Sequence, residues 1–537
     1  MITESTLTAP QTSSASQAAP NEIAVRNPRT GKTIYTFREP TDQEIQQSFE
    51  RARAAFGTIR AMTVRERLEE IGKIKRYFLA NKEKIVDRIV EETGKARTDA
   101  LVSEVFAILD IIHYYQKNAE KVLGDQVVST PLLQFPKKSK IYYEPIGTVL
   151  IISPWNFPLN LALVPIVTAF TAGNSVVFKP SEWTPLCGLI EEIVEESGFM
   201  KEAITVVYGG KDVGRKLIDQ RPAKILFTGS TRAGRQIMEQ AAKYLIPVEL
   251  ELGGKDPMVV FDDVDVERAA KAAAWGGMMN CGQTCTSVER IIVQEGVYPE
   301  FVAALKRRIE KLSHAGACEG KADEGNLDVG CITADFQVKI VEEQIKDAKA
   351  KGAEVFSAGT HTEGSHAIPP TMITNVDKSM KVLQDETFGP VVTVEKFKTE
   401  DEAVAMANDS PYGLSGSVWS QDLVRAERVA RRIETGSLSI NNVLATQGNP
   451  GLPFGGTKDS GFGRYKGPLG LQGFSNPKSV LIDHTKKPEV YWYPYSKEKY
   501  HLFSRLLDAI YGGSPFWVLK AALIGLKMES LAKKKRK

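Results

Sequence analysis

Short apolar segments alternate with helical segments in the first half of the chain, and this alternation constrains the fold more than any other feature. The strand-like segments are 149–152, 175–178, 204–207 and 225–227, and helical patterns cover 186–197 and 234–245. Strands that alternate with helices form βαβ units, because parallel strands need a long crossover connection. We therefore predict an α/β fold that contains a parallel sheet.

The N-terminal part of the chain differs from this region. Residues 1–20 consist mainly of Ser, Thr, Ala and Pro, so they can bury no core and we expect them to be disordered. They lack the basic start and the apolar run of a secretory signal. From Thr41 the pattern becomes helical, and the pairs Thr41/Glu44 and Thr63/Glu66 predict capping boxes.

Composition argues against several classes of function. A net charge of +3 in 537 residues gives no basis for nucleic-acid binding. The cysteines at 187, 281, 285, 318 and 331 show no metal-ligand spacing, so we predict no metal site. We interpret all of them as reduced thiols of a reducing compartment, which predicts a cytoplasmic protein.

One carboxylate and one thiol are candidate catalytic groups. Glu251 precedes a glycine pair, and Cys285 lies further along among small polar residues. Such a cysteine can act as a thiolate nucleophile, and a glutamate that flexible backbone brings close can act as a general base. Taken alone, each has a more ordinary interpretation, because single cysteines are usually small buried apolar residues and single glutamates are usually solvated.

Seven motifs in a fixed order favour the catalytic interpretation. They are Pro154–Pro158 (PWNFP), Lys179–Glu182 (KPSE), Phe227–Ser230 (FTGS), Glu251–Lys255 (ELGGK), Cys285, Glu386–Pro390 (ETFGP) and Pro453–Gly456 (PFGG). In this order they resemble the aldehyde dehydrogenase superfamily, in its NAD(P)-dependent, hydrolytic form. The resemblance extends from about residue 21 to about residue 485.

This resemblance implies an organisation into domains. It implies a Rossmann-like dinucleotide-binding domain, an α/β catalytic domain and a small oligomerisation arm, assembled as a homodimer or homotetramer. The resemblance assigns 21–124 and 144–251 to the first domain, 252–476 to the second, and 125–143 and 477–485 to the arm. Residues 486–537 form an extension beyond the usual end of the family.

The resemblance also implies a cofactor, NAD, with NADP as an alternative. Gly229 and Ser230 lie in a strand-to-helix turn, where backbone N–H groups can bind phosphate. A carboxylate at Glu182 would bind the ribose 2′-hydroxyl of NAD and repel the 2′-phosphate of NADP. The implied cofactor-binding residues are Trp155, Lys179, Ser181, Glu182, Gly229, Ser230, Leu252, Gly253, Glu386 and Phe388.

In the chemistry that the resemblance implies, Cys285 adds to an aldehyde carbonyl and the resulting thioester is hydrolysed. Asn156 and the Cys285 backbone N–H would stabilise the oxyanion, and Glu251 would activate the water. A CoA-acylating enzyme is one alternative, although family members of that type usually lack the glutamate. A non-catalytic scaffold is another, but it would be expected to have lost Cys285, Asn156 or Glu251, and the chain retains all three.

A second thiol competes with the nucleophile. Cys281 lies four residues before Cys285, so the two could share a helical face. Cys281 could then act as a resolving thiol when Cys285 is oxidised.

Apolar residues around the candidate catalytic groups suggest the substrate. By resemblance, several of them line the aldehyde tunnel, and the loop 441–453 shapes its mouth. None is Arg or Lys, so we expect a medium or long apolar aldehyde rather than a carboxylate-bearing semialdehyde. These residues are Phe157, Leu159, Leu161, Leu163, Val164, Met278, Met279, Thr284 and Thr286.

The C-terminal extension contains two apolar helical patterns, at 501–511 and 516–531, followed by the basic run KKKRK. The second run falls short of the ~20 residues needed to span a bilayer. An aromatic-rich helix with a basic end is typical of attachment to an anionic membrane surface, which we predict. Packing on a partner subunit, a solubilising end and a nuclear signal are the alternatives.

Overall fold

The computed structural model describes residues 22–131, 134–316, 323–513 and 515–533. The tail 1–20 and most of the terminal basic run lie outside the described residues. The chain divides into two compact units, residues 1–124 with 143–477 and residues 125–142 with 478–537. The predicted division of the first unit into two domains stays a prediction.

One sheet of the first unit has six strands in the order β19-β9-β8-β5-β6-β7, and only β19 is antiparallel to its neighbour. In β5, Val149 and Ile151 enter one hydrophobic cluster, whereas Leu150 and Ile152 enter another. Strands buried on both faces need helices on both sides, which explains their unbroken apolar sequences. The strands are β5 Thr148–Ile152, β6 Ser175–Lys179, β7 Ile204–Val206, β8 Lys224–Thr228, β9 Val248–Glu251 and β19 Gly461–Phe462.

Helices cover the two faces of this sheet. The Val149 cluster contains residues of α2, α4, α5 and α6, and the Leu150 cluster contains residues of α1, α7 and α8. Both predicted capping boxes, at Thr41 and Thr63, are confirmed at the starts of α1 and α2. The helices are α1 Asp42–Ala61, α2 Val64–Thr93, α3 Arg97–Ala100, the π-helix η1 Leu101–Phe106, α4 Ala107–Val122, α5 Asn160–Thr171, α6 Leu189–Ser197, α7 Lys211–Asp219 and α8 Thr231–Ala242.

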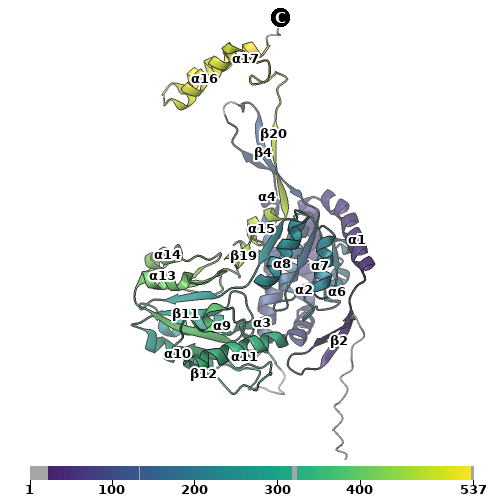
Figure 1. Cartoon of the computed structure of the whole chain (residues 1–537). Coiled ribbons are helices and arrows are strands. Elements are labelled where there is room, and N and C mark those ends of the chain that lie inside the picture. Colours follow the sequence, from purple (N-terminus) through teal and green to yellow (C-terminus); the bar gives the residue numbers. More distant parts are fainter. Residues whose placement is uncertain (1–21, 132–133, 317–322, 514, 534–537) are drawn as a thin grey trace, which may run out of the picture. The chain divides into compact units, whose positions relative to one another are not determined.

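The other large sheet has seven strands in the order β12-β13-β14-β11-β10-β16-β17. Figure 1 shows it between α9, α10 and α11 on one side and α13 and α14 on the other, in agreement with the hydrophobic clusters on its two faces. Its strands are β10 Asp256–Val260, β11 Val288–Gln294, β12 Glu354–Ser357, β13 Thr371–Thr374, β14 Val391–Phe397, β16 Ser417–Trp419 and β17 Ser439–Ile440. Its helices are α9 Val266–Met278, α10 Tyr298–Glu310, α11 Asp335–Ala350, α13 Glu400–Asn408 and α14 Leu423–Ala430.

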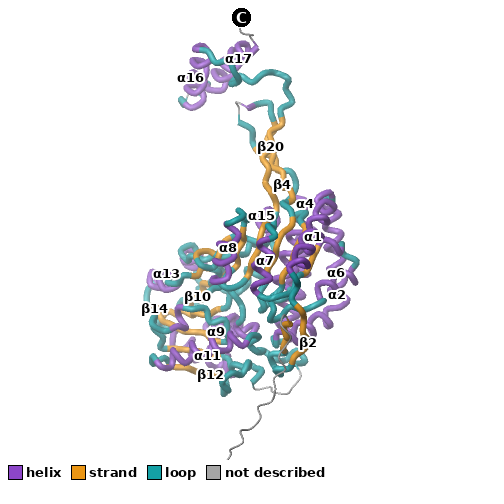
Figure 2. The backbone as a smooth tube through the Cα atoms, turned by 45° about the vertical axis from the view of Figure 1, so that its right-hand side comes forward, coloured by secondary structure: helices purple, strands orange, loops and turns teal. Residues whose placement is uncertain are grey.

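The second unit contains two helices that pack as a hairpin, α16 Lys497–Tyr511 and α17 Trp517–Lys533 (Figure 2). A three-stranded sheet has the strand order β20-β4-β3, and β3 belongs to the second unit. No helix among the described residues is both long and apolar enough to cross a membrane. The remaining elements are β1 Glu22–Arg26, β2 Thr33–Arg38, β3 Gln126–Val128, β4 Lys138–Pro145, β15 Tyr412–Gly413, β18 Thr457–Lys458, β20 Ser475–Ile482, η3 Lys201–Ala203, η4 Met279–Gly282, α12 Lys381–Gln384 and α15 Gly467–Gly473.

Candidate active site

A cavity of about 890 Å³ opens at the carboxyl ends of β5, β6, β8 and β9. Ligands of parallel α/β sheets bind at this edge, because the loops there leave polar backbone groups free. We call it the strand-end cavity. Every residue that the family resemblance assigned to the cofactor lines it: Trp155, Lys179, Ser181, Glu182, Gly229, Ser230, Leu252, Gly253, Glu386 and Phe388.

The strand-end cavity carries charges of both signs. Lys179 and Glu182 form an ion pair of 3.7 Å, and burial lowers the pKa of Lys179 while Glu182 raises it. Lys211 and Arg215, the first and the fifth residue of α7, also line the cavity, although sequence reasoning did not identify them. Nothing in their local sequence distinguishes them from surface cations.

The turn from β8 into α8 differs in one detail from the prediction. The Gly229 N–H donates to the Glu251 carbonyl at 3.0 Å, so it is not available to an anion. Ser230 caps α8 by accepting a hydrogen bond from the Ala233 N–H at 3.3 Å. The anion-binding capacity of this turn therefore depends on the remaining N–H groups at the start of α8.

A buried ion pair holds the segment that contains Glu386 and Phe388. Lys255 Nζ lies 2.5 Å from Glu289 Oε2, and the Glu289 carboxylate accepts hydrogen bonds from the Thr387 and Phe388 N–H groups. Glu386 accepts from the Gly254 N–H at 3.0 Å, and burial raises the pKa of Glu386 to about 8. The ETFGP motif is therefore fixed by groups distant in sequence.

A second cavity, of about 420 Å³, has a largely apolar lining drawn from η1, α4, α5 and the loop 441–453. We call it the apolar cavity. Of the predicted tunnel residues, Phe157, Leu161, Val164, Met279 and Thr284 line it. The others, Leu159, Leu163, Met278 and Thr286, do not appear among the residues described as lining it.

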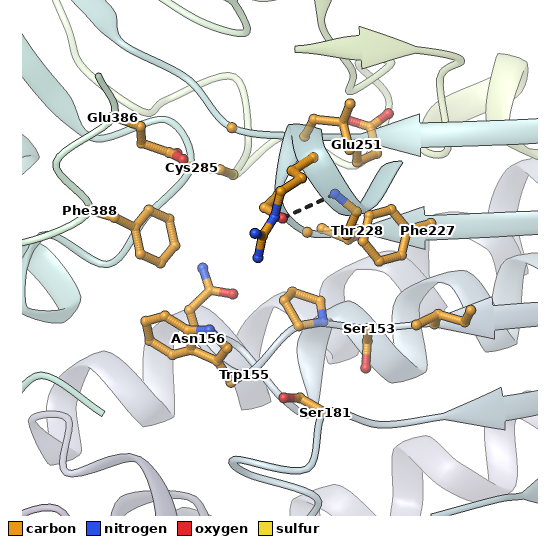
Figure 3. Close-up of a pocket in the computed structure, with 18 of the residues that line it drawn as sticks. Ser153, Trp155, Asn156, Ser181, Phe227, Thr228, Glu251, Cys285, Glu386 and Phe388 are labelled. Atoms are coloured by element: carbon orange, nitrogen blue, oxygen red, sulfur yellow. Dashed lines mark hydrogen bonds between the residues drawn. The ribbon is translucent and has the colours of Figure 1, made fainter. Parts of the chain in front are cut away.

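The two cavities share Cys285 and Glu251, so the candidate nucleophile and base lie where they meet. Figure 3 shows Glu251 at the end of a strand, with Cys285 and Asn156 on other segments that converge on the strand-end cavity. A Cβ at Gly254 would lie 2.3 Å from the Cys285 carbonyl oxygen. The absence of a side chain at Gly254 is therefore what lets the two backbones approach so closely.

Cys285 follows a tightly constrained turn. Asn280 and Cys281 have φ of 55° and 57°, a left-handed conformation that interrupts η4. Gln283 locks the turn, since its side chain donates to the Asn280 and Cys331 carbonyls at 2.9 and 3.1 Å. Burial raises the pKa of the Cys285 thiol, and the carboxylates of Asp256, Glu386 and Glu251 raise it further.

This turn corrects the expectation for Cys281. The left-handed backbone prevents a shared helical face with Cys285, so that interpretation is wrong. Cys281 is fully buried in the hydrophobic cluster beneath the seven-stranded sheet, whereas Cys285 packs against the cluster beneath the six-stranded one.

Glu251 is a buried carboxylate whose oxygens have no hydrogen-bond partner among the described residues. Burial raises its pKa well above the usual range, and Glu249 raises it further. A buried carboxylate without a partner is costly, and this makes Glu251 a candidate for a group that acts on a substrate or a water.

Asn156 is positioned by its own backbone and by the cysteine turn. Its Nδ2 donates to the Gln283 carbonyl at 2.9 Å, which uses one of its two N–H groups. The backbone carbonyl oxygen of Asn156 accepts from Lys95 Nζ at 2.7 Å and from Asn280 Nδ2 at 3.1 Å. The second N–H of the amide can therefore serve as a fixed oxyanion donor.

Three large lining residues of the apolar cavity were not identified from the sequence. Phe106 and Trp275 are 62% and 51% exposed, so apolar surface continues outward from the cavity. Lys466 also lines it, which contradicts the expectation of a wall without Lys or Arg.

Comparison with known proteins gives the chain's relatives. The model of the "Aldehyde dehydrogenase family" matches residues 15–480. A 4,4'-diapolycopene aldehyde oxidase from a Methylomonas species is 40% identical over 91% of each chain. A glutarate-semialdehyde dehydrogenase from Pseudomonas aeruginosa is 36% identical over 86% of this chain and 94% of its own.

Solved structures agree with these relatives. A Mycobacterium tuberculosis aldehyde dehydrogenase complexed with NAD+ has a TM-score of 0.81 at 32% identity, over 89% of this chain and 96% of its own. A Staphylococcus aureus betaine aldehyde dehydrogenase in complex with NAD+ has the same TM-score and identity, over 88% and 94%. The predicted α/β fold class is thereby confirmed.

Proposed function

Because the chain belongs to the aldehyde dehydrogenase family and is an aldehyde-oxidising enzyme, we propose that it converts a medium or long apolar aldehyde to the carboxylic acid with NAD, or NADP, as oxidant. The observation that carries this proposal is the junction of the two cavities. A thiol and a partnerless carboxylate lie where a strand-end cavity meets an apolar one.

The residues of the chain divide the reaction into two steps. The Cys285 sulfur adds to the aldehyde carbon, and the Asn156 amide and the Cys285 N–H stabilise the oxyanion. Loss of hydride from that carbon leaves a thioester on Cys285. Glu251 then takes a proton from the water that attacks the thioester, which releases the acid and the thiol.

The strand-end cavity fits a dinucleotide. It presents Lys179 and Glu182 for ribose hydroxyls, the start of α8 for a phosphate, and Glu386 and Phe388 beside Cys285. When bound, the nicotinamide supplies the hydride acceptor. The Mycobacterium tuberculosis and Staphylococcus aureus relatives were solved in complex with NAD+. Lys211 and Arg215, which line the same cavity as Glu182, support acceptance of NADP.

The names of the relatives do not select one aldehyde, since they include a diapolycopene aldehyde oxidase, a semialdehyde enzyme and a betaine aldehyde enzyme. The apolar lining and the exposed Phe106 and Trp275 favour an extended apolar substrate. The glutamate at 251 supports hydrolysis rather than transfer to CoA.

An aldehyde panel tests this function. We expect kcat/KM with NAD to rise along the neutral series from propanal to decanal and to stay low for glutarate semialdehyde. Each CH₂ that enters the cavity contributes ~0.8 kcal/mol. Preference for the semialdehyde, or turnover that requires added CoA, would refute the proposal.

We also propose that the helical hairpin attaches the enzyme to an anionic membrane surface. Its core joins Leu502 and Leu506 of α16 to Ile524 and Met528 of α17. The apolar face that the sequence offers to a membrane is thus partly used within the hairpin. A second apolar face of α17 remains exposed, formed by Val518, Leu519, Leu523 and Leu526.

This second face supports the proposal, because a contiguous exposed apolar surface is typical of a site that contacts a membrane or another protein. Exposed aromatic residues of the same unit suit a lipid interface, among them Trp492, Tyr493, Tyr495, Tyr500 and Tyr511. The cations of the terminal run each add ~1 kcal/mol against anionic lipid.

Co-sedimentation with phosphatidylserine-containing and with pure phosphatidylcholine vesicles tests the attachment. The full-length protein should pellet with the anionic vesicles in low salt, and Leu519→Ser with Leu523→Ser should remain in solution. The control pair, Leu245→Ser with Leu423→Ser, removes exposed leucines of the first unit. Full-length protein that stays in solution would indicate that this face contacts a partner subunit.

For the assembly we propose a homodimer or homotetramer built through the arm. β3 is an edge strand, and Val127 and Val128 are exposed. An apolar edge strand of this kind favours pairing with another chain. Sedimentation velocity of wild type and Val127→Lys tests this, and a monomeric wild type would refute it.

A further inference from the structure

Lys466 is the only Lys or Arg among the described residues that line the apolar cavity. The same lining contains Cys285, Glu251 and one further carboxylate, Asp110 of α4. A lone cation among such groups influences their ionisation strongly, because charge interactions gain strength where water is scarce.

The fold directs Lys466 to this position. β19 pairs antiparallel with β9, with Gly461 opposite Glu251, and the chain then leads past the catalytic pair. Lys466 Nζ donates to the Gln447 carbonyl at 2.5 Å and lies 5.7 Å from the centre of the Phe454 ring. These contacts hold the ammonium group in the cavity wall, so that it is positioned near the site.

A second cation lies behind Glu251 but is engaged elsewhere. A Cβ at Gly455 would lie 2.7 Å from Glu251 Oε1 and 2.9 Å from Arg464 Nη1, so this glycine separates the two charges. Arg464 Nη1 already donates to the Gly456 and Gly463 carbonyls. Arg464 does not appear among the described residues that line either cavity, whereas Lys466 faces the space in which the reaction occurs.

We propose that the Lys466 ammonium stabilises the ionised forms of Glu251 and Cys285, and so acts on aldehyde oxidation through these two residues. The inference rests on the proposed function. It adds a positioning residue that the substrate does not need to touch.

The titration of the surrounding groups is consistent with this role. Burial lowers the pKa of Lys466 to about 8, while Asp110, Cys285 and Glu251 raise it. Burial and the charge of Glu249 raise the pKa of Glu251, whereas Arg464 and Lys466 lower it. Tyr465 also faces the pair, but burial raises its pKa, so it remains neutral.

The first test follows the thiol without substrate. We would measure the rate at which iodoacetamide alkylates Cys285 in the full-length protein across pH, by mass spectrometry of the Cys285 peptide. At neutral pH Lys466→Met should slow alkylation about three- to tenfold, and Lys466→Arg should stay within about twofold of wild type. Above pH about 8 the wild type loses its ammonium and should approach Lys466→Met, while Lys466→Arg retains its charge.

Lys458→Met is the matched control, since Lys458 bonds to the Asn408 carbonyl and does not appear among the described residues that line either cavity. Its alkylation profile should match wild type. An unchanged profile in Lys466→Met, or an equal shift in Lys458→Met, overturns the inference.

The second test separates this role from binding of a substrate carboxylate. If Lys466 acts through Glu251 and Cys285, Lys466→Met lowers kcat by the same factor for octanal and glutarate semialdehyde. A loss confined to the KM of the semialdehyde would instead make Lys466 a substrate-binding residue and overturn the inference. A wild type that oxidises no aldehyde would refute the proposed function. The alkylation profile would still test whether Lys466 affects the ionisation of Cys285.

Discussion

The two cavities that meet at Cys285 are built in different ways. The strand-end cavity is formed by turns at the ends of parallel strands and by charged side chains such as Lys179 and Glu182. The apolar cavity is lined mainly by side chains of helices and loops, with Lys466 as its cation. Groups whose positions are set by a sheet are hard to change one at a time. Side chains on helices and loops can vary without disturbing the sheet. We therefore expect oxidant binding and aldehyde selection to be separable by mutation.

The largest effect should come from Cys285, one of the residues that line both cavities. Cys285→Ala should reduce aldehyde oxidation by at least ~10³-fold, because no other group supplies the nucleophile. Binding of NAD, measured by quenching of protein fluorescence, should persist. Cys281→Ala is the control and should keep most activity, because Cys281 is buried in a different cluster. An active Cys285→Ala enzyme would show that Cys285, where the two cavities meet, is not the nucleophile.

Glu251→Gln should separate the two steps at the same junction. The variant should give one equivalent of reduced cofactor in a rapid-mixing experiment and then stall, with steady-state turnover reduced ~10²–10⁴-fold. In wild type, turnover should rise with pH, because the raised pKa of Glu251 keeps the carboxyl protonated at lower pH. Loss of the initial burst as well would mean that Glu251 also serves the addition step.

Changes at the outer, apolar end of the apolar cavity should affect aldehyde selection alone. Phe106→Ser removes apolar surface at the outer end of the cavity and should lower kcat/KM for decanal about tenfold, with little effect on propanal. The KM for NAD should not change. An equal loss on both aldehydes would indicate damage to η1 rather than loss of a binding surface.

The smallest effect should come from the strand-end cavity. Glu182→Gln removes the charge that repels a 2′-phosphate and should raise the NADP to NAD ratio of kcat/KM by about three- to tenfold. Removing the carboxylate should leave the preference among aldehydes unchanged. A ratio that stays constant would mean that Lys211 and Arg215 already outweigh Glu182.

Several parts of the site could be predicted because their signal is local. The strands around Val149 and Ile225 are short apolar runs, and Thr41 and Thr63 start helices through contacts with residues three positions later. The glycine pair after Glu251 and the turn before Ser230 also have distinctive compositions. Interactions within a few residues leave a pattern that the sequence displays directly.

Other parts depend on residues that meet only after folding. The spacing of Cys281 and Cys285 predicts a shared helical face, but a hydrogen bond from Gln283 to the distant Cys331 carbonyl helps to hold a left-handed turn there. Lys466 looks like a surface cation until β19 pairs with β9 and carries it into the cavity. In the C-terminal hairpin, the sequence reveals apolar residues but not which of them face α16.

The sequence by itself determined the α/β class and the family, and it selected Cys285, Glu251 and Asn156 as the candidate catalytic residues, since the residue types that perform chemistry recur in motifs. Only the tertiary structure decided how the lining is shared between two cavities, which cation lies beside the thiol and which face of α17 stays exposed. The physical reason is that burial and charge interactions depend on distances between segments far apart in the chain, and these distances are set by the packing of sheets and helices.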